Sequence, residues 1–82
     1  MISVQVKLFA GASQLAGHSA VRLELAQEAS VADLRRELLA RYPQLVPLDP
    51  QLRFAVDRDY AAEDDPIRAG QEIAAIPPVS GG

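Results

Sequence analysis

The chain ends in Gly81-Gly82, and the carboxylate of Gly82 is its best candidate for a reactive group. Glycine has no Cβ, so two glycines form a thin segment whose backbone reaches conformations that other residues avoid. A terminal carboxylate behind such a segment can enter a narrow enzyme channel where a side chain would clash. A Gly-Gly pair also arises by chance and chain ends are often disordered, so a frayed end is the alternative interpretation.

The other residues form no catalytic group that we can identify. The chain has no cysteine, which excludes disulfides, thiolate metal sites and a thiol nucleophile of its own. His18 is the only histidine, and we interpret it as a surface residue because no second metal ligand accompanies it. The acidic residues do not have the spacing of a calcium-binding loop and predict a solvated turn region; they are Asp57, Asp59, Glu63, Asp64 and Asp65. We therefore expect no metal, no bound cofactor and no enzyme activity of the chain alone.

Length and composition indicate one small folded domain. The chain has 82 residues, of which 49% are hydrophobic, and a formal net charge of −3. It contains no basic cluster with interleaved aromatic residues, which argues against nucleic-acid binding. No apolar run approaches the roughly 18 residues that span a bilayer, and no signal peptide is visible, so we expect a cytoplasmic protein. The mildly acidic composition suits a basic protein partner or reflects ordinary solubility.

Apolar residues recur at every second position in three segments, a pattern typical of half-buried strands, and a fourth segment places Ile73 and Ala75 on one strand face and Ala74 and Ile76 on the other. The stretch 10–18 is rich in glycine and serine, which predicts a loop that joins the first two strands into a hairpin. A short additional strand is expected at residues 60–62. The four longer strands are predicted at 2–9, 20–25, 52–57 and 72–76.

A single main helix is predicted over residues 31–42, where apolar residues recur on one helical face. Ser30 and Asp33 have the spacing of a capping box at its start. Pro43 cannot continue the helix, and it begins an irregular stretch that also holds Pro47 and Pro50.

The predicted order is strand, strand, helix, strand, short strand, strand. One helix on one face of a mixed sheet covers a core of this size, so we expect an α+β fold. This is the order of the ubiquitin-like β-grasp, in which the first and last strands lie side by side at the sheet centre. We expect a β-grasp domain over residues 1–76 and an extended C-terminal Gly-Gly arm over residues 77–82. Pro77-Pro78 would end strand pairing and stiffen the root of the arm.

Three apolar residues are candidates for partner binding. Phe9 and Ile76 are out of phase with the buried residues of their strands. If the first and last strands are neighbours, both side chains lie on the outer sheet face, where Tyr60 can join them. Aromatic and aliphatic side chains beside an arm form a docking surface. The alternative is that the strand register slips near the strand ends and places one or more of them in the core.

Six segments, in order along nearly the whole chain, resemble the small subunits of molybdopterin synthase, which are ubiquitin-like sulfur carriers of the MoaD/ThiS type. The last segment is the most specific. The segments are Leu8-Phe9-Ala10, Leu15-Ala16-Gly17, Ser30-Val31-Ala32-Asp33-Leu34, Ala55-Val56-Asp57, Gly70-Gln71-Glu72-Ile73-Ala74 and Pro77-Pro78-Val79-Ser80-Gly81-Gly82.

The resemblance implies a role in molybdenum cofactor biosynthesis as the non-catalytic, sulfur-donating subunit of a sulfurtransferase complex. A ubiquitin-activating-like enzyme would use ATP to adenylate Gly82, and a sulfur donor protein would convert it to a thiocarboxylate. The sulfur would pass to a cyclic pyranopterin precursor in the active site of the synthase large subunit. The family's partner contacts correspond to Phe9, Tyr60 and Ile76, and the arm corresponds to Pro77, Pro78, Val79, Ser80 and Gly81. The implied assembly is a heterotetramer of two small and two large subunits.

Other functions remain open from the sequence. The same carrier chemistry serves thiamine, cysteine and thio-tRNA pathways. A ubiquitin-like modifier joined to lysines would also use a Gly-Gly end, and a simple interaction domain could carry one by chance.

Overall fold

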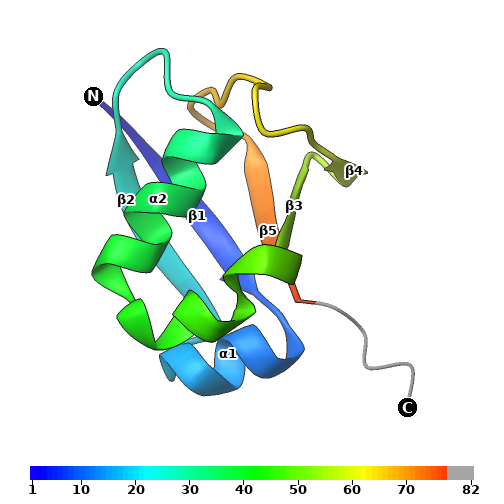
Figure 1. The fold of residues 1–82 in the computed structure, drawn as a ribbon. Coiled ribbons are helices and arrows are strands. Elements are labelled where there is room, and N and C mark those ends of the chain that lie inside the picture. Colours follow the sequence, from blue (N-terminus) through cyan, green and yellow to red (C-terminus); the bar gives the residue numbers. More distant parts are fainter. Residues whose placement is uncertain (78–82) are drawn as a thin grey trace.

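Five strands form one mixed sheet, with helices packed on one of its faces (Figure 1). The computed structural model describes residues 1–77 of the chain. The strands are β1 (Ile2–Leu8), β2 (Ala20–Leu25), β3 (Arg53–Val56), β4 (Asp59–Tyr60) and β5 (Glu72–Ile76). The helices are α1 (Ala10–Ala16), α2 (Val31–Arg41) and the 3₁₀ helix η1 (Pro43–Gln51).

The strand order is β2-β1-β5-β3-β4, so the first and last strands are neighbours at the sheet centre. β1 and β5 run parallel, with Leu8 opposite Ala75, and the other neighbouring pairs are antiparallel. This arrangement confirms the predicted α+β fold and its β-grasp topology. A parallel central pair means that β1 and β5 end at the same edge of the sheet.

The core lies between the sheet and α2. β1, β2 and β5 bury alternate residues, as expected of strands with one buried face, whereas β3 buries the consecutive residues Phe54 and Ala55. Ile67, in the loop before β5, is also fully buried, although no periodic pattern marked it. The largest fully buried side chains are Phe54, Leu23, Leu34, Leu38, Leu45, Leu52, Ile67, Ile73, Val6 and Val31.

The prediction of a loop over residues 10–18 is wrong, because α1 occupies most of this stretch. Ala12 and Ala16 are one helical turn apart and both are buried, so packing against the rest of the domain stabilises a helix too short to persist alone. Gly17 ends it at φ 77, a left-handed conformation that suits glycine. β1 and β2 are antiparallel as predicted, but a helix joins them rather than a short loop.

Two boundaries also differ from prediction. The proline-rich stretch is not irregular but forms the 3₁₀ helix η1, which buries Leu45. The short strand covers Asp59–Tyr60 instead of residues 60–62. It starts earlier because the chain reverses in a tight turn at Asp57 and Arg58.

The capping box at the start of α2 is confirmed. The backbone N–H of Asp33 donates to Ser30 Oγ at 3.3 Å, and the backbone N–H of Ser30 donates to Asp33 Oδ2 at 2.9 Å. The Ser30 N–H bond is the main reason why the pKa of Asp33 is lowered. The first two helical N–H groups donate to the carbonyls of Asp65 and Glu63, in a loop distant in sequence. The first N–H groups of α2, which have no acceptor within the helix, therefore donate to both local and distant oxygens.

We expect Ser30→Ala to lower the free energy of unfolding by about 1 kcal/mol, because it removes the acceptor for the Asp33 N–H. Urea unfolding measures the loss. Ser19→Ala, at an exposed position, is the matched control and should change stability by less than about 0.5 kcal/mol. Equal unfolding midpoints for Ser30→Ala and the wild type would contradict this role of the cap.

Candidate functional site

Phe9, Tyr60 and Ile76 border one open pocket of about 430 Å³ on the outer face of the sheet. Phe9 follows β1, Tyr60 belongs to β4, and Ile76 ends β5. Phe9 is 48% exposed and Tyr60 is 65% exposed, while Ile76 is half-buried. The structure therefore brings the three predicted residues together outside the buried core. We call this group the docking patch, and its role in partner binding stays a prediction.

A tight turn between β3 and β4 places Tyr60 in the docking patch. Asp57 and Arg58 have φ values of 51 and 75, and positive φ at both central residues is typical of a type I′ hairpin turn. Asp57 Oδ1 accepts a hydrogen bond of 3.0 Å from the backbone N–H of Glu72, which ties the turn to β5. Tyr60 then pairs with Ala55 in the β3–β4 ladder.

Charged side chains surround the docking patch. Glu72 Oε2 lies 3.4 Å from Lys7 Nζ, and Glu72 Oε1 lies 3.7 Å from Arg58 Nε. The guanidinium carbon of Arg53 lies 5.6 Å from the centroid of the Tyr60 ring. None of these cations was predicted from the sequence as a partner-binding residue. Lys7 and Arg53 could have been identified, because each alternates with buried residues of its strand and so lies on the outer face of the sheet.

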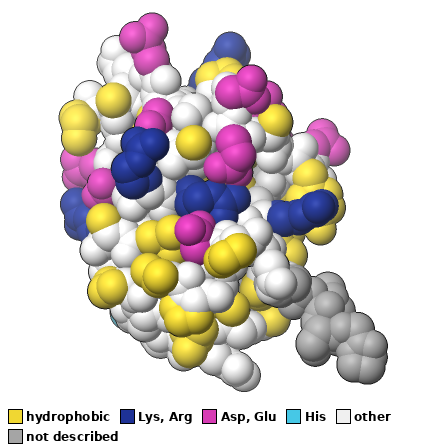
Figure 2. Space-filling view, in the orientation of Figure 1, with side chains coloured by type: hydrophobic (Ala, Val, Ile, Leu, Met, Phe, Trp, Pro, Cys, Tyr) yellow, Lys and Arg dark blue, Asp and Glu magenta, His cyan; other side chains and the backbone are white. Residues whose placement is uncertain are grey.

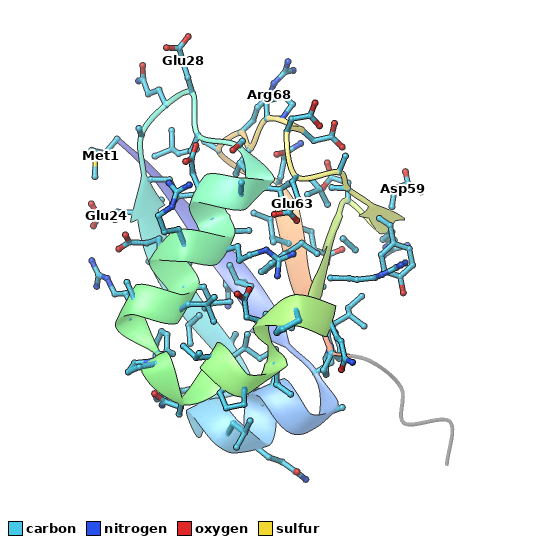
Figure 3. All side chains as sticks on the ribbon, viewed as in Figure 1. Met1, Glu24, Glu28, Asp59, Glu63 and Arg68 are labelled. Carbon is cyan, nitrogen blue, oxygen red and sulfur yellow. The ribbon has the colours of Figure 1, made fainter. Side chains whose placement is uncertain are left out.

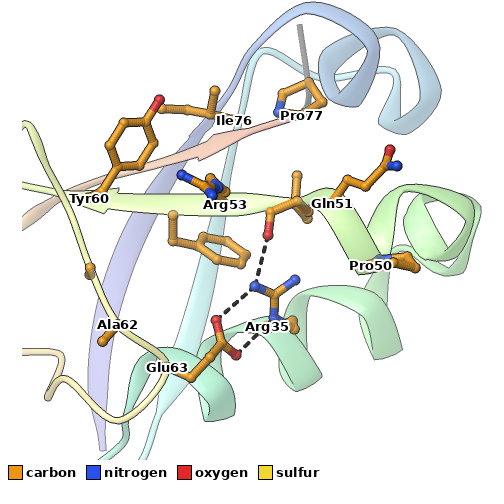
Figure 4. A pocket seen from close by; sticks show the side chains of 12 residues that line it. Arg35, Pro50, Gln51, Arg53, Tyr60, Ala62, Glu63, Ile76 and Pro77 are labelled. Atoms are coloured by element: carbon orange, nitrogen blue, oxygen red, sulfur yellow. Dashed lines mark hydrogen bonds and ion pairs between the residues drawn. The ribbon is translucent and has the colours of Figure 1, made fainter. Parts of the chain in front are cut away.

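A larger pocket of about 680 Å³ adjoins the docking patch, because Tyr60 and Ile76 line both (Figure 4). Arg35 from α2 lies in this pocket and forms an ion pair of 2.8 Å with Glu63. Its two terminal nitrogens also donate to backbone carbonyls, one of them that of Leu52 at 2.8 Å.

Arg35 cross-links four parts of the fold. It pairs with Asp49 of η1 at 3.1 Å, and its guanidinium carbon lies 5.1 Å from the Phe54 ring centroid in β3. The hydrogen bond to Glu63 raises the pKa of Arg35, and the same bond lowers the pKa of Glu63. Two carboxylates and two backbone carbonyls of the fold accept from the Arg35 guanidinium, so we interpret Arg35 as a structural residue. Figure 2 shows charged side chains of both signs together on this face of the molecule.

We expect Glu63→Gln to reduce the sensitivity of the fold to acid. The folded-state pKa of Glu63 is lowered by Arg35, so its stabilising effect is present above the unfolded-state pKa and is lost as pH falls through the folded one. The melting temperature of the wild type should therefore fall more than that of Glu63→Gln between about pH 6 and about pH 3. Glu28→Gln changes an exposed carboxylate at a chain bend (Figure 3) and serves as control. Equal pH profiles for Glu63→Gln and the wild type would contradict the prediction.

Residues 1–77 show no group of three or more His, Cys, Asp or Glu side chains that could hold a metal ion. His18 is exposed, with its ring centroid 6.0 Å from that of Tyr42 in an edge-on arrangement. Asp57 and Asp65 accept hydrogen bonds from backbone N–H groups, as expected of a turn region. Within the same residues, none of the helices has the length and apolar character needed to cross a membrane.

β5 leads directly toward the predicted arm. Pro77 is buried and lines the larger pocket beside Ile76. Residues 78–82 lie outside the described part of the chain, and they include the predicted reactive residue Gly82 and the arm residues Pro78, Val79, Ser80 and Gly81. The structure thus places the last residue before this segment next to the docking patch.

A family comparison identifies the group of proteins to which this chain is related. The ThiS family matches residues 6–82. The chain belongs to the ThiS family. Its membership confirms the resemblance found in the sequence, since the matched range covers all but the first residues of this ThiS-family chain.

Similar proteins extend along the full length of this ThiS-family chain. The molybdopterin synthase sulfur carrier subunit of Caenorhabditis briggsae is 39% identical over 84 residues, with 100% of each chain covered. The crystal structure of small archaeal modifier protein 1 from Haloferax volcanii has a TM-score of 0.87 at 32% identity, covering 98% of this chain and 99% of that one. The complex of subunits 1 and 2 of molybdopterin-converting factor from Helicobacter pylori has a TM-score of 0.71 at 20% identity, covering 99% and 100%, which supports the fold alone.

Proposed function

We propose that this chain is the sulfur-carrier small subunit of a molybdopterin synthase. The observation that carries the proposal is the position of the end of β5. This strand lies in the sheet centre, ends at Ile76 in the docking patch, and continues through Pro77 toward the Gly-Gly end. A partner bound to the docking patch is therefore next to Pro77, after which the sequence continues to Gly82. Family membership and the full-length relative named as a sulfur carrier subunit support the choice of reaction.

In the first step, a ubiquitin-activating-like enzyme joins the carboxylate of Gly82 to AMP and releases pyrophosphate from ATP. A carboxylate is a poor electrophile, and the acyl-adenylate supplies the leaving group that it lacks. A sulfur donor protein then supplies sulfur at the sulfide level, which attacks the acyl carbon and displaces AMP, and this leaves a thiocarboxylate on Gly82. The chain needs no thiol for this chemistry, in agreement with its lack of cysteine.

In the second step, the docking patch binds the large subunit and the arm delivers the thiocarboxylate to the cyclic pyranopterin precursor. The sulfur attacks a carbon of the precursor and displaces an oxygen substituent, which links the chain to the precursor through sulfur. Water then attacks the Gly82 acyl carbon and breaks its bond to sulfur, so the sulfur stays on the precursor and the carboxylate is regenerated for the next cycle. The large subunit supplies the groups that stabilise developing charge and move protons. The part of this chain is to dock and to position Gly82, in an assembly of two small and two large subunits.

The intact mass of the chain tests this function. The chain is incubated with an activating enzyme, ATP and a sulfur source, and the expected product has one oxygen replaced by one sulfur at Gly82. The thiocarboxylated chain is then mixed with the large subunit and the precursor, and formation of molybdopterin is measured. Failure of the thiocarboxylated chain and a competent large subunit to convert the precursor would overturn the assignment.

The similarity to small archaeal modifier protein 1 favours a second candidate function, that of a protein modifier. In this case the activated Gly82 forms isopeptide bonds with lysines of other proteins. Mass spectrometry of cell lysate distinguishes the two functions, because a modifier gives lysine-linked Gly82 adducts and a sulfur carrier gives a free thiocarboxylate. Carriers for thiamine, cysteine or thio-tRNA pathways would give the same thiocarboxylate but would not sustain molybdopterin synthesis.

A further inference from the structure

The docking patch is surrounded by cations although the chain as a whole has a net charge of −3. Lys7, Arg53 and Arg58 stand around it, and Glu72 is the acidic residue among those that line its pocket. We propose that the partner receiving the arm presents carboxylates around its apolar contact, and that Arg58 is the residue of this chain that recognises them. This inference rests on the proposed function and names the chemistry of the partner surface.

The acidic residues near the docking patch neutralise its cations only in part. Glu72 is shared between Lys7 at 3.4 Å and Arg58 at 3.7 Å, and the side chains of these two cations are 53% and 89% exposed. Exposed ion pairs of this length are weak and exchange readily for other partners. The carboxylate of Asp57 accepts a hydrogen bond from the Glu72 N–H and remains anionic. Asp59 pairs with Val56, so strand alternation places it on the opposite face from Tyr60. Three cations therefore stand against two carboxylates on the outer face, an excess of one positive charge on a chain whose net charge is −3.

The backbone of Arg58 provides a second, independent observation. Its φ of 75 lies in the left-handed region, at the turn position where type I′ hairpins favour glycine. A non-glycine residue at this conformation destabilises the fold. The fold gains little in return, because the side chain is almost fully exposed and, within residues 1–77, makes one ion pair of 3.7 Å. Strain of this kind at an exposed cation beside an apolar surface points to a ligand for that cation.

Arginine has the geometry needed for this recognition. A guanidinium presents parallel N–H donors that match the two oxygens of a carboxylate. Arg53 lies against the face of Tyr60, an arrangement that leaves the edge of a guanidinium free to donate. Arg53 and Arg58 thus lie near the most exposed aromatic residue of the docking patch, which suits a partner with an acidic rim around an apolar centre.

Binding kinetics between the full-length chain and the synthase large subunit test the inference. We expect Arg58→Glu to lower the association rate about tenfold at about 50 mM salt, with a much smaller difference at about 500 mM, where charges are screened. The matched control is Arg68→Glu, which reverses an exposed arginine in the loop before β5 (Figure 3). It should change the rate less than about twofold, because it lies outside the docking patch.

Arg58→Gly separates recognition from folding. It should raise the melting temperature by about 2–5 °C through relief of the left-handed strain, and lower the low-salt association rate about threefold through loss of the cation. A lower melting temperature would show that Arg58 serves the fold, and would overturn the inference. Equal low-salt rates for Arg58→Glu and Arg68→Glu, or faster binding by Arg58→Glu, would also overturn it while leaving the proposed function intact. If the wild type did not bind the large subunit, the proposed function would fall, and this inference with it.

Discussion

Deletion of Gly82 is expected to lower sulfur transfer by at least about 100-fold while leaving the fold and the docking affinity nearly unchanged. The deletion shortens the arm by one residue, or about 3.5 Å of extended chain. Misplacement of a reacting group by even about 1 Å can reduce a rate by two orders of magnitude. The measurements are single-turnover molybdopterin formation by the thiocarboxylated chain, its melting temperature, and its affinity for the large subunit.

The affinity of the shortened chain serves as the internal control. We expect a dissociation constant within about threefold of the wild type, because Phe9, Tyr60 and Ile76 remain in place. An interaction domain with a chance Gly-Gly end predicts that the deletion changes none of the three measurements. Normal sulfur transfer by the shortened chain would therefore exclude Gly82 as the sulfur carrier.

Two isoleucines of β5 should respond in opposite ways to truncation. Ile73 is fully buried, and Ile73→Ala is expected to lower the free energy of unfolding by about 3 kcal/mol, since it leaves a cavity at the sheet centre. Ile76 is half-buried on the outer face. Ile76→Ala should lower stability by about 1 kcal/mol or less and weaken binding of the large subunit about tenfold. Chemical denaturation and titration calorimetry measure the two effects separately.

The comparison is matched because both substitutions remove the same atoms from one strand. If Ile76→Ala destabilised the fold as much as Ile73→Ala, Ile76 would belong to the core. If Ile76→Ala left the affinity unchanged, the docking patch would not be the contact surface. We expect the Ile73→Ala variant to keep its affinity for the large subunit at temperatures where the variant is folded.

Local sequence patterns predicted most of the secondary structure. Alternation in β1, β2 and β5 reflects a sheet with one buried face, and the spacing of Ser30 and Asp33 marked the start of α2. These signals succeed because each depends on residues close together in the chain. α1 was missed because its two buried alanines give little periodic signal and its glycine and serine are typical of turns.

The loop that follows β4 shows what a local pattern does not contain. Its buried residue Ile67 donates its backbone N–H to the carbonyl of Ala29, and the carbonyls of Glu63 and Asp65 accept from the first N–H groups of α2. Arg35 reaches Glu63 in the same loop. These contacts join residues far apart in sequence, so their pairing depends on the complete fold.

By itself, the sequence determined the α+β class, the β-grasp order of elements and the choice of Gly82 as the candidate reactive group. It also placed Phe9 and Ile76 on the outer sheet face, because the side-chain period of a strand fixes which residues share a face. Only the tertiary structure decided that these residues meet Tyr60 in one patch and that cations surround it. The parallel pairing of β1 with β5, and the strained turn at Arg58, bring together charges from distant segments. The sign of charge at the docking patch thus depends on strand order and turn geometry, which net composition does not describe.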